Sequence, residues 1–166
     1  ITLDGKEYEM LDINFPTIDP KHPYALSKEE EEIMSRLESA FLNCEKLQDH
    51  MRFLLNKGGL YKVYNGNLLY HGCVPLKEDG TLKSVRLYGR SYKGKSLYEV
   101  LESYVRKGFY ALDKKEKERG KDMMWYIWLS ENSPLFGKDK MATFERYFLA
   151  EKETHKEKKN PYYNLL

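Results

Sequence analysis

A chain of 166 residues with 41% hydrophobic and 33% charged side chains is long enough and apolar enough to bury a core, which excludes a disordered protein. The 28 lysines and arginines nearly balance the 26 acidic residues, and the net charge of +2 gives no overall field that would attract nucleic acid or an anionic membrane. The sequence contains neither an apolar run of the about 18 residues that a membrane helix needs nor a signal peptide. We therefore expect a cytoplasmic protein.

The first residues predict an antiparallel hairpin followed by an irregular connector. Asp4-Gly5 is a turn dipeptide, and apolar residues alternate roughly with polar ones over residues 8–15. Three prolines between residues 16 and 23 then interrupt regular structure. Residues 1–26 should accordingly form a hairpin and a connector.

Residues 27–58 have the pattern of one long amphipathic helix. Ser27 and Glu30 have the spacing of a capping box, in which each side chain binds a backbone N–H that the helix start leaves unpaired. Apolar residues follow at steps of three and four from Ile33 to Leu55, which indicates one packed face. Gly58, followed by a second glycine, can end the helix in a left-handed conformation.

Residues 59–94 predict strands. The stretch YKVYNGNLLYHGCVPL contains Asn65-Gly66, which is typical of the tight turn of a β-hairpin. The second strand of this hairpin is apolar without alternation, so we expect it to be covered on both faces. It ends at His71-Gly72, which places an imidazole at the carboxyl end of a strand. A short strand near 84–88 and a glycine-bounded loop over 89–94 should follow.

Residues 95–166 form the predicted helical part. Ser96 could cap a second helix, with the charged residues 113–121 as its frayed extension. Asp122 could cap a third helix, whose body MMWYIWL is apolar on all sides and would need burial all round. A fourth helix is predicted over 141–148. The expected fold class is thus α+β, with antiparallel hairpins packed with about four helices.

The histidines and cysteines do not by themselves define a catalytic or metal site. His71 follows a strand, while the other three histidines are scattered and form no HExxH pair. A single histidine in such a place is more often a hydrogen-bonded structural residue than a metal ligand. Cys44 and Cys73 lie on different predicted elements without CxxC spacing, so we expect buried free thiols.

Several long segments resemble the class III fructose-1,6-bisphosphatases typical of Firmicutes and some Bacteroidetes. They are YNGNLLYHGCVPL, MMWYIWLSENSPLFGKDKMATFERYF, THKEKKNPYY and the helix NCEKLQDHMRFLLNKG, and together they extend the resemblance over nearly the whole chain. The resemblance implies a hydrolase of gluconeogenesis that removes the 1-phosphate of fructose 1,6-bisphosphate. It also implies a calcineurin-like metallophosphoesterase core that depends on manganese or a similar divalent ion.

The resemblance assigns a role to one residue of this chain, and the chemistry of two further side chains makes them candidates for substrate contacts. The histidine of a YHG-type motif at a strand end is a metal ligand in such a core, and His71 occupies that position here. Lys138 and Arg146 are weaker candidates for contacts to the substrate phosphates, since arginine offers a bidentate fork and lysine a point charge. Surface salt bridges would explain these two residues equally well.

Other motifs of such a core are absent from the sequence. They are the aspartate motifs that bridge two metals, the Gly-Asn-His-Asp motif that supplies the general acid, and the later Gly-His-Thr motif. Because one imidazole cannot hold a two-metal site, we expect the 166-residue segment alone to be inactive and to bind manganese weakly or not at all. The chain begins with isoleucine, and we expect it to be an internal segment of a larger enzyme.

Two other function classes stay open. The chain could be a non-catalytic α+β module for assembly or regulation of a phosphatase, which could form homo-oligomers. A nucleic-acid-binding module has less support, because the lysines near the ends are interleaved with acidic residues.

Overall fold

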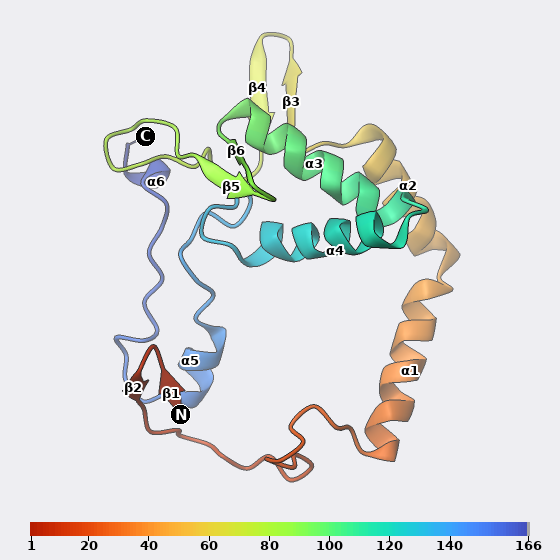
Figure 1. Cartoon of the computed structure of the whole chain (residues 1–166), viewed down its shortest axis with the longest axis vertical. Coiled ribbons are helices and arrows are strands. Elements are labelled where there is room, and N and C mark those ends of the chain that lie inside the picture. Colours follow the sequence, from red (N-terminus) through yellow and green to blue (C-terminus); the bar gives the residue numbers. More distant parts are fainter. Residues whose placement is uncertain (166) are drawn as a thin grey trace. The chain divides into compact units, whose positions relative to one another are not determined.

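The computed structural model describes residues 1–165, and Figure 1 shows its helices and strands. The chain forms two compact units, one of residues 1–58 and one that begins at Gly59. The part of the chain that it describes contains six helices and three two-stranded antiparallel sheets. The prediction of an α+β fold with antiparallel hairpins is confirmed. Within the described residues, no helix is long and apolar enough to cross a membrane.

The first unit opens with a hairpin that is shorter than predicted. Strands β1 (Thr2–Leu3) and β2 (Lys6–Glu7) pair in register around Asp4-Gly5, and both turn residues have positive φ. Residues 8–15, predicted as a continuing strand, form no regular strand. Their alternating pattern is insufficient because a regular strand forms only where a neighbouring segment supplies ladder partners along its length.

The predicted long helix is interrupted and forms α1 (Lys28–Leu42) and α2 (Glu45–Lys57). Asn43 is the C-cap of α1. Its backbone N–H makes the last helical hydrogen bond, to the Ser39 carbonyl oxygen at 3.0 Å, and its side-chain amide donates to the same oxygen at 2.9 Å. Cys44 then adopts an extended conformation and is exposed, so the prediction that its thiol is buried is wrong.

The ends of this helical region test two predicted caps. The capping box is present, with Ser27 N–H donating to Glu30 Oε2 at 2.7 Å and Glu30 N–H donating to Ser27 Oγ at 3.2 Å. Gly58 ends α2 with φ of −86°, so the predicted left-handed conformation is wrong. Glycine is favoured there for space, since a Cβ would lie 2.6 Å from the Leu54 carbonyl oxygen.

The second unit begins with the predicted central hairpin. Strands β3 (Tyr61–Tyr64) and β4 (Asn67–Tyr70) pair around Asn65-Gly66, whose φ angles of 49° and 77° suit a tight turn. The expectation that β4 is covered on both faces is wrong, because Leu68 and Leu69 remain more than half exposed in this two-stranded sheet.

A second hairpin follows where only one strand was predicted. Strand β5 (Val85–Leu87) confirms the short strand near 84–88, and β6 (Arg90–Tyr92) lies in the predicted loop. Tyr88 and Gly89 form the turn with positive φ. Both apolar residues of β5 face the core.

The core of the second unit lies between this hairpin and the helices α3 (Lys95–Tyr110) and α4 (Lys114–Leu129). Gly108 and Gly120 let the two helix backbones approach closely, since a Cβ on Gly120 would lie 2.1 Å from the Gly108 nitrogen. The buried apolar side chains that form this core are Val85, Leu87, Leu97, Leu101, Met123 and Ile127.

Three predictions about these helices are wrong. The cap of α3 is Gly94, while Ser96 lies within the first turn and donates to the Lys93 carbonyl oxygen. The charged residues that follow α3 start α4 instead, because Asp113 caps that helix by accepting from Glu116 N–H at 2.8 Å. The body of α4 is also not buried all round, since both of its tryptophans are exposed.

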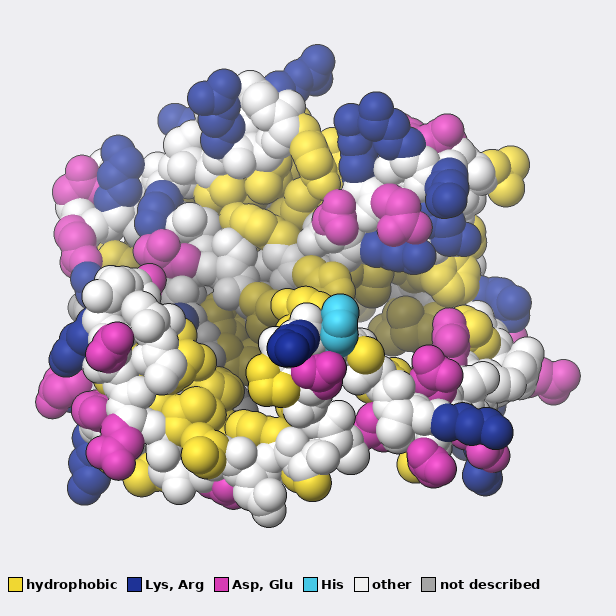
Figure 2. Space-filling view, turned by 60° about the horizontal axis from the view of Figure 1, so that its bottom comes forward, with side chains coloured by type: hydrophobic (Ala, Val, Ile, Leu, Met, Phe, Trp, Pro, Cys, Tyr) yellow, Lys and Arg dark blue, Asp and Glu magenta, His cyan; other side chains and the backbone are white. Residues whose placement is uncertain are grey.

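Two short helices complete the described chain. Helix α5 (Thr143–Phe148) confirms the predicted fourth helix, and α6 (Tyr162–Leu165) was not predicted. Apolar side chains remain exposed among charged ones at the surface, as Figure 2 shows for one face.

Candidate functional site

The turn that presents His71 is anchored by its backbone. It follows β4 directly, and Gly72 has φ of +88°, a conformation that residues with a side chain rarely adopt. A Cβ on Gly72 would lie 2.1 Å from the Pro134 carbonyl oxygen, and the same oxygen accepts a 2.7 Å hydrogen bond from Cys73 N–H. Only glycine therefore permits this close approach, which fixes the position of the neighbouring His71 backbone.

Tyrosine side chains provide a second anchor for the same turn. The buried Tyr98 hydroxyl donates to the Cys73 carbonyl oxygen at 2.8 Å, and the hydroxyls of Tyr70 and Tyr162 form a hydrogen bond between β4 and α6. Burial raises the pKa of the Tyr98 hydroxyl, and the hydrogen bond with Tyr70 raises the pKa of Tyr162 to about 12. The Tyr98 and Tyr162 hydroxyls are therefore neutral near pH 7, and the two hydrogen bonds hold the turn.

The His71 side chain itself is exposed and lines a pocket of about 340 Å³. The other lining residues come from the approach to β3, from β3 and β4 themselves, and from Leu135. Within the described residues, no group of three or more His, Cys, Asp or Glu side chains could hold a metal ion. The chain therefore supplies His71 as a single candidate ligand on a rigid turn, and its metal role stays a prediction.

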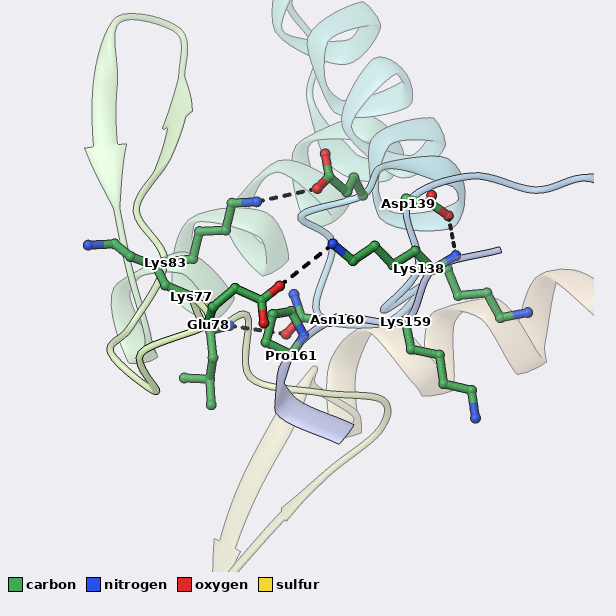
Figure 3. A pocket seen from close by; sticks show the side chains of 11 residues that line it. Lys77, Glu78, Lys83, Lys138, Asp139, Lys159, Asn160 and Pro161 are labelled. Atoms are coloured by element: carbon green, nitrogen blue, oxygen red, sulfur yellow. Dashed lines mark hydrogen bonds and ion pairs between the residues drawn. The ribbon is translucent and has the colours of Figure 1, made fainter. Parts of the chain in front are cut away.

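A second pocket, the lysine pocket, contains one of the predicted phosphate contacts, Lys138 (Figure 3). It has a volume of about 330 Å³, and its charged lining comprises five lysines and three acidic residues. These residues are Lys77, Lys83, Lys138, Lys158 and Lys159, with Glu78, Glu131 and Asp139. The excess of positive charge makes this pocket attractive to an anion.

Ion pairs neutralise part of the positive charge in the lysine pocket. Lys83 lies 3.4 Å from Glu131, and Lys158 lies 3.6 Å from Glu78. Both pairs are solvent-accessible, so each contributes little to stability and can exchange its partner for another anion. The pocket therefore keeps flexible positive charge at its rim.

The two predicted phosphate contacts meet on one carboxylate, Glu157. Lys138 Nζ lies 2.6 Å from Glu157 Oε2, and Arg146 NH2 lies 3.0 Å from Oε1, which also accepts from Ala142 N–H at 3.1 Å. The hydrogen bond from Lys138 leads the interactions that lower the pKa of Glu157 to about 2. Lys138 lines the lysine pocket, whereas His71 lines the separate pocket beside β3 and β4.

Two residues that organise the lysine pocket were missed by sequence reasoning. Glu157 was one acid among many in a charged run, and nothing in its spacing marks it as the partner of a lysine 19 positions away. Asn160 is buried, and its Oδ1 accepts from Leu76 N–H at 3.2 Å and from Tyr162 N–H at 3.1 Å. An Asn-Pro dipeptide favours a turn, but its presence here could not reveal the contact with Leu76.

Comparisons with known proteins bear on the whole chain. A family model described as Firmicute fructose-1,6-bisphosphatase matches residues 1–166. The protein named fructose-1,6-bisphosphatase class 3 from Listeria innocua is 53% identical over 170 residues, which cover 99% of this chain and 25% of the relative. The protein of the same name from Clostridium tetani is 52% identical over 164 residues, with 98% of this chain and 25% of the relative covered.

The chain thus spans about a quarter of the length of the curated relatives it matches. No solved structure is significantly similar to it. The resemblance noted in the sequence is confirmed, because the family match extends over all residues of the chain. The chain belongs to the Firmicute fructose-1,6-bisphosphatase family.

Proposed function

We propose that the protein containing this chain is a fructose-1,6-bisphosphatase, which hydrolyses fructose 1,6-bisphosphate to fructose 6-phosphate and phosphate in gluconeogenesis. The observation that supports this proposal is the 52–53% identity over nearly the whole chain to proteins that are named for this activity. The reaction would take place in the cytoplasm.

His71 is the metal ligand that this chain contributes in the proposed enzyme. The residues that follow it, Gly72 with positive φ and Cys73, lie against the Pro134 carbonyl oxygen, while the His71 side chain stays exposed. A neutral imidazole on such a rigid turn suits manganese or a similar divalent ion, which would supply Lewis-acid activation of the phosphoryl group. The remaining ligands would come from parts of a metallophosphoesterase core outside this chain, because three or four protein ligands are needed.

Lys138 and Arg146 are the proposed contacts for the phosphates of the sugar substrate. Their side chains are 41% and 50% exposed, so each keeps N–H donors for a ligand while it is paired with Glu157. The shared carboxylate would orient both cations toward the same region. A purely structural role in holding residues 138–157 together predicts a different experimental result.

Steady-state kinetics of the full-length protein separates these possibilities. The wild-type protein should release phosphate from fructose 1,6-bisphosphate in the presence of manganese, and the isolated 166-residue chain should not. Lys138→Met and Arg146→Met should both lower the melting temperature, because Glu157 loses a partner in each variant. If the two residues also contact substrate, each variant should in addition raise KM. A lower melting temperature with unchanged KM would assign both residues to the structure alone, and a full-length protein without turnover would refute the proposed activity.

A further inference from the structure

The outer face of α4 exposes a group of large apolar side chains that the described residues of this unit leave uncovered. Trp125 and Trp128 are 68% and 69% exposed, which is unusual for the two largest apolar side chains of a helix. They line a groove of about 560 Å³ with Met124, Leu129 and Met141, and Lys121 lies at its edge. We call this surface, Lys121, Met124, Trp125, Trp128, Leu129 and Met141, the tryptophan groove.

The same face of α4 changes character along its length. Residues that share a helical face recur at steps of three and four, which aligns Lys114, Lys117 and Lys121 with Trp125 and Trp128. The amino-terminal half of this face is charged and suited to water, and the carboxyl-terminal half is aromatic. A helix face that only contacts water would remain charged along its whole length. The two tryptophans therefore indicate that the carboxyl-terminal half of this face contacts another apolar surface.

The folding of this unit does not account for the tryptophans. The opposite face of α4 already contributes Met123 and Ile127 to the core, and Gly120 packs against α3. Both tryptophans point away from these contacts, since they remain more than two-thirds exposed. Exposed apolar groups of this size, gathered in one groove, mark an interaction surface. Tryptophan is also among the residues that contribute most to binding energy in such surfaces.

The length of the relatives indicates what covers the tryptophan groove. This chain accounts for 25% of each of the two relatives, so about three quarters of such a protein lies outside it. Segments of one polypeptide meet at a high effective concentration, and a groove of moderate size is sufficient for an interface between domains of the same chain. A second copy would have to associate from solution through this same small groove.

We propose that the tryptophan groove is an intramolecular interface, which an apolar surface from the part of the same polypeptide outside residues 1–166 occupies. This interface is independent of the proposed phosphatase activity, because it rests on the exposure of α4 and on the length of the relatives. It fixes the position of the unit that begins at Gly59 against the remainder of the protein.

Hydroxyl-radical footprinting of the full-length protein tests this interface directly. Modification of Trp125 and Trp128 should be about tenfold slower in the native protein than in the urea-unfolded protein, as expected if side chains now 68% and 69% exposed become at least about 95% buried. The matched control is Lys117→Trp, which places a tryptophan on the charged half of the same face. This reporter should react at nearly the rate of the unfolded protein.

Cross-linking from Lys121 identifies the occupant, with mixed isotope-labelled protein to separate links within a chain from links between chains. We expect links within one chain to residues outside 1–166, and protection of both tryptophans that does not change on dilution. Rapid modification of both tryptophans would overturn the proposal. So would links confined to residues 1–58, or links between chains with protection that disappears on dilution.

Discussion

Substitution of Gly120 by alanine tests the close packing of α3 and α4 on which the second unit depends. The added Cβ would lie 2.1 Å from the Gly108 nitrogen, 2.4 Å from the Gly108 Cα and 2.6 Å from the Tyr104 carbonyl oxygen, where ordinary contact begins at 3.4 Å. All three atoms belong to backbone and cannot rotate away, so the two helices must separate. Gly108→Ala is the matched control, because its Cβ would meet the nearest atom of the neighbouring helix at 3.0 Å.

The expected magnitudes follow from two opposing contributions. Overpacking a well-packed core costs about 1–3 kcal/mol and occasionally more, whereas alanine in place of a helical glycine gains about 0.8–1 kcal/mol. For Gly120→Ala the severe overlap dominates, and we expect the free energy of unfolding to fall by about 2 kcal/mol. For Gly108→Ala a shift of a few tenths of an ångström relieves the overlap, and the two contributions should nearly cancel.

Native-state hydrogen exchange of the full-length protein measures this difference in the helices concerned. A loss of about 2 kcal/mol corresponds to roughly 30-fold faster exchange of the protected amides of α3 and α4. The control variant should stay close to wild type. The reasoning is refuted if Gly120→Ala exchanges as slowly as wild type, because the helices would then not be in backbone contact.

Three further predictions concern a cap, an ion cluster and the two thiols. Ser27→Ala removes the N-terminal cap of α1 and should cost about 1 kcal/mol, seen as faster exchange of the first amides of that helix; unchanged exchange would contradict the cap. Folding lowers the pKa of Glu157 from 4.5 to about 2, so its carboxylate stabilises the fold above pH 4.5 and loses that contribution as the pH falls toward 2. Glu157→Gln should therefore lower the melting temperature at pH 7 and flatten its decline between pH 4.5 and 2, and an equally steep decline would be inconsistent with this role. Burial raises the pKa of Cys73 to about 11, so iodoacetamide at pH 8 should label the exposed Cys44 and leave Cys73 unmodified until the protein unfolds; equal labelling would disprove the buried environment.

The elements that the sequence predicted well depend on residues close together in the chain. The capping box of Ser27 and Glu30 and the turn of Asn65-Gly66 both formed as expected, because each is decided within four residues or fewer. The division of residues 27–58 into two helices was missed, since the apolar pattern continues through the break. Only the backbone shows that Asn43 ends a helix at that point.

The predictions that failed depend on contacts between segments distant in the sequence, or on whether a side chain is buried in the folded structure. Periodicity showed that the body of α4 is apolar on all sides, but it could not show that its two tryptophans remain more than two-thirds exposed. For the candidate site, the sequence placed His71 at a strand end, while the Pro134 contact that fixes Gly72 requires the fold. The pairing of Lys138 and Arg146 with Glu157 is likewise a tertiary contact that spacing does not reveal.

Metal analysis of the full-length protein after His71→Ala tests the proposed role of this chain most directly. Loss of the ligand should lower manganese affinity and fructose 1,6-bisphosphate turnover by at least about tenfold. Mutation of residues that merely hydrogen-bond to a metal ligand already lowers metal affinity or activity about 10–100-fold. His50→Ala on the exposed surface of α2 is the matched control and should leave both unchanged. Full metal content together with full turnover in His71→Ala would contradict the account.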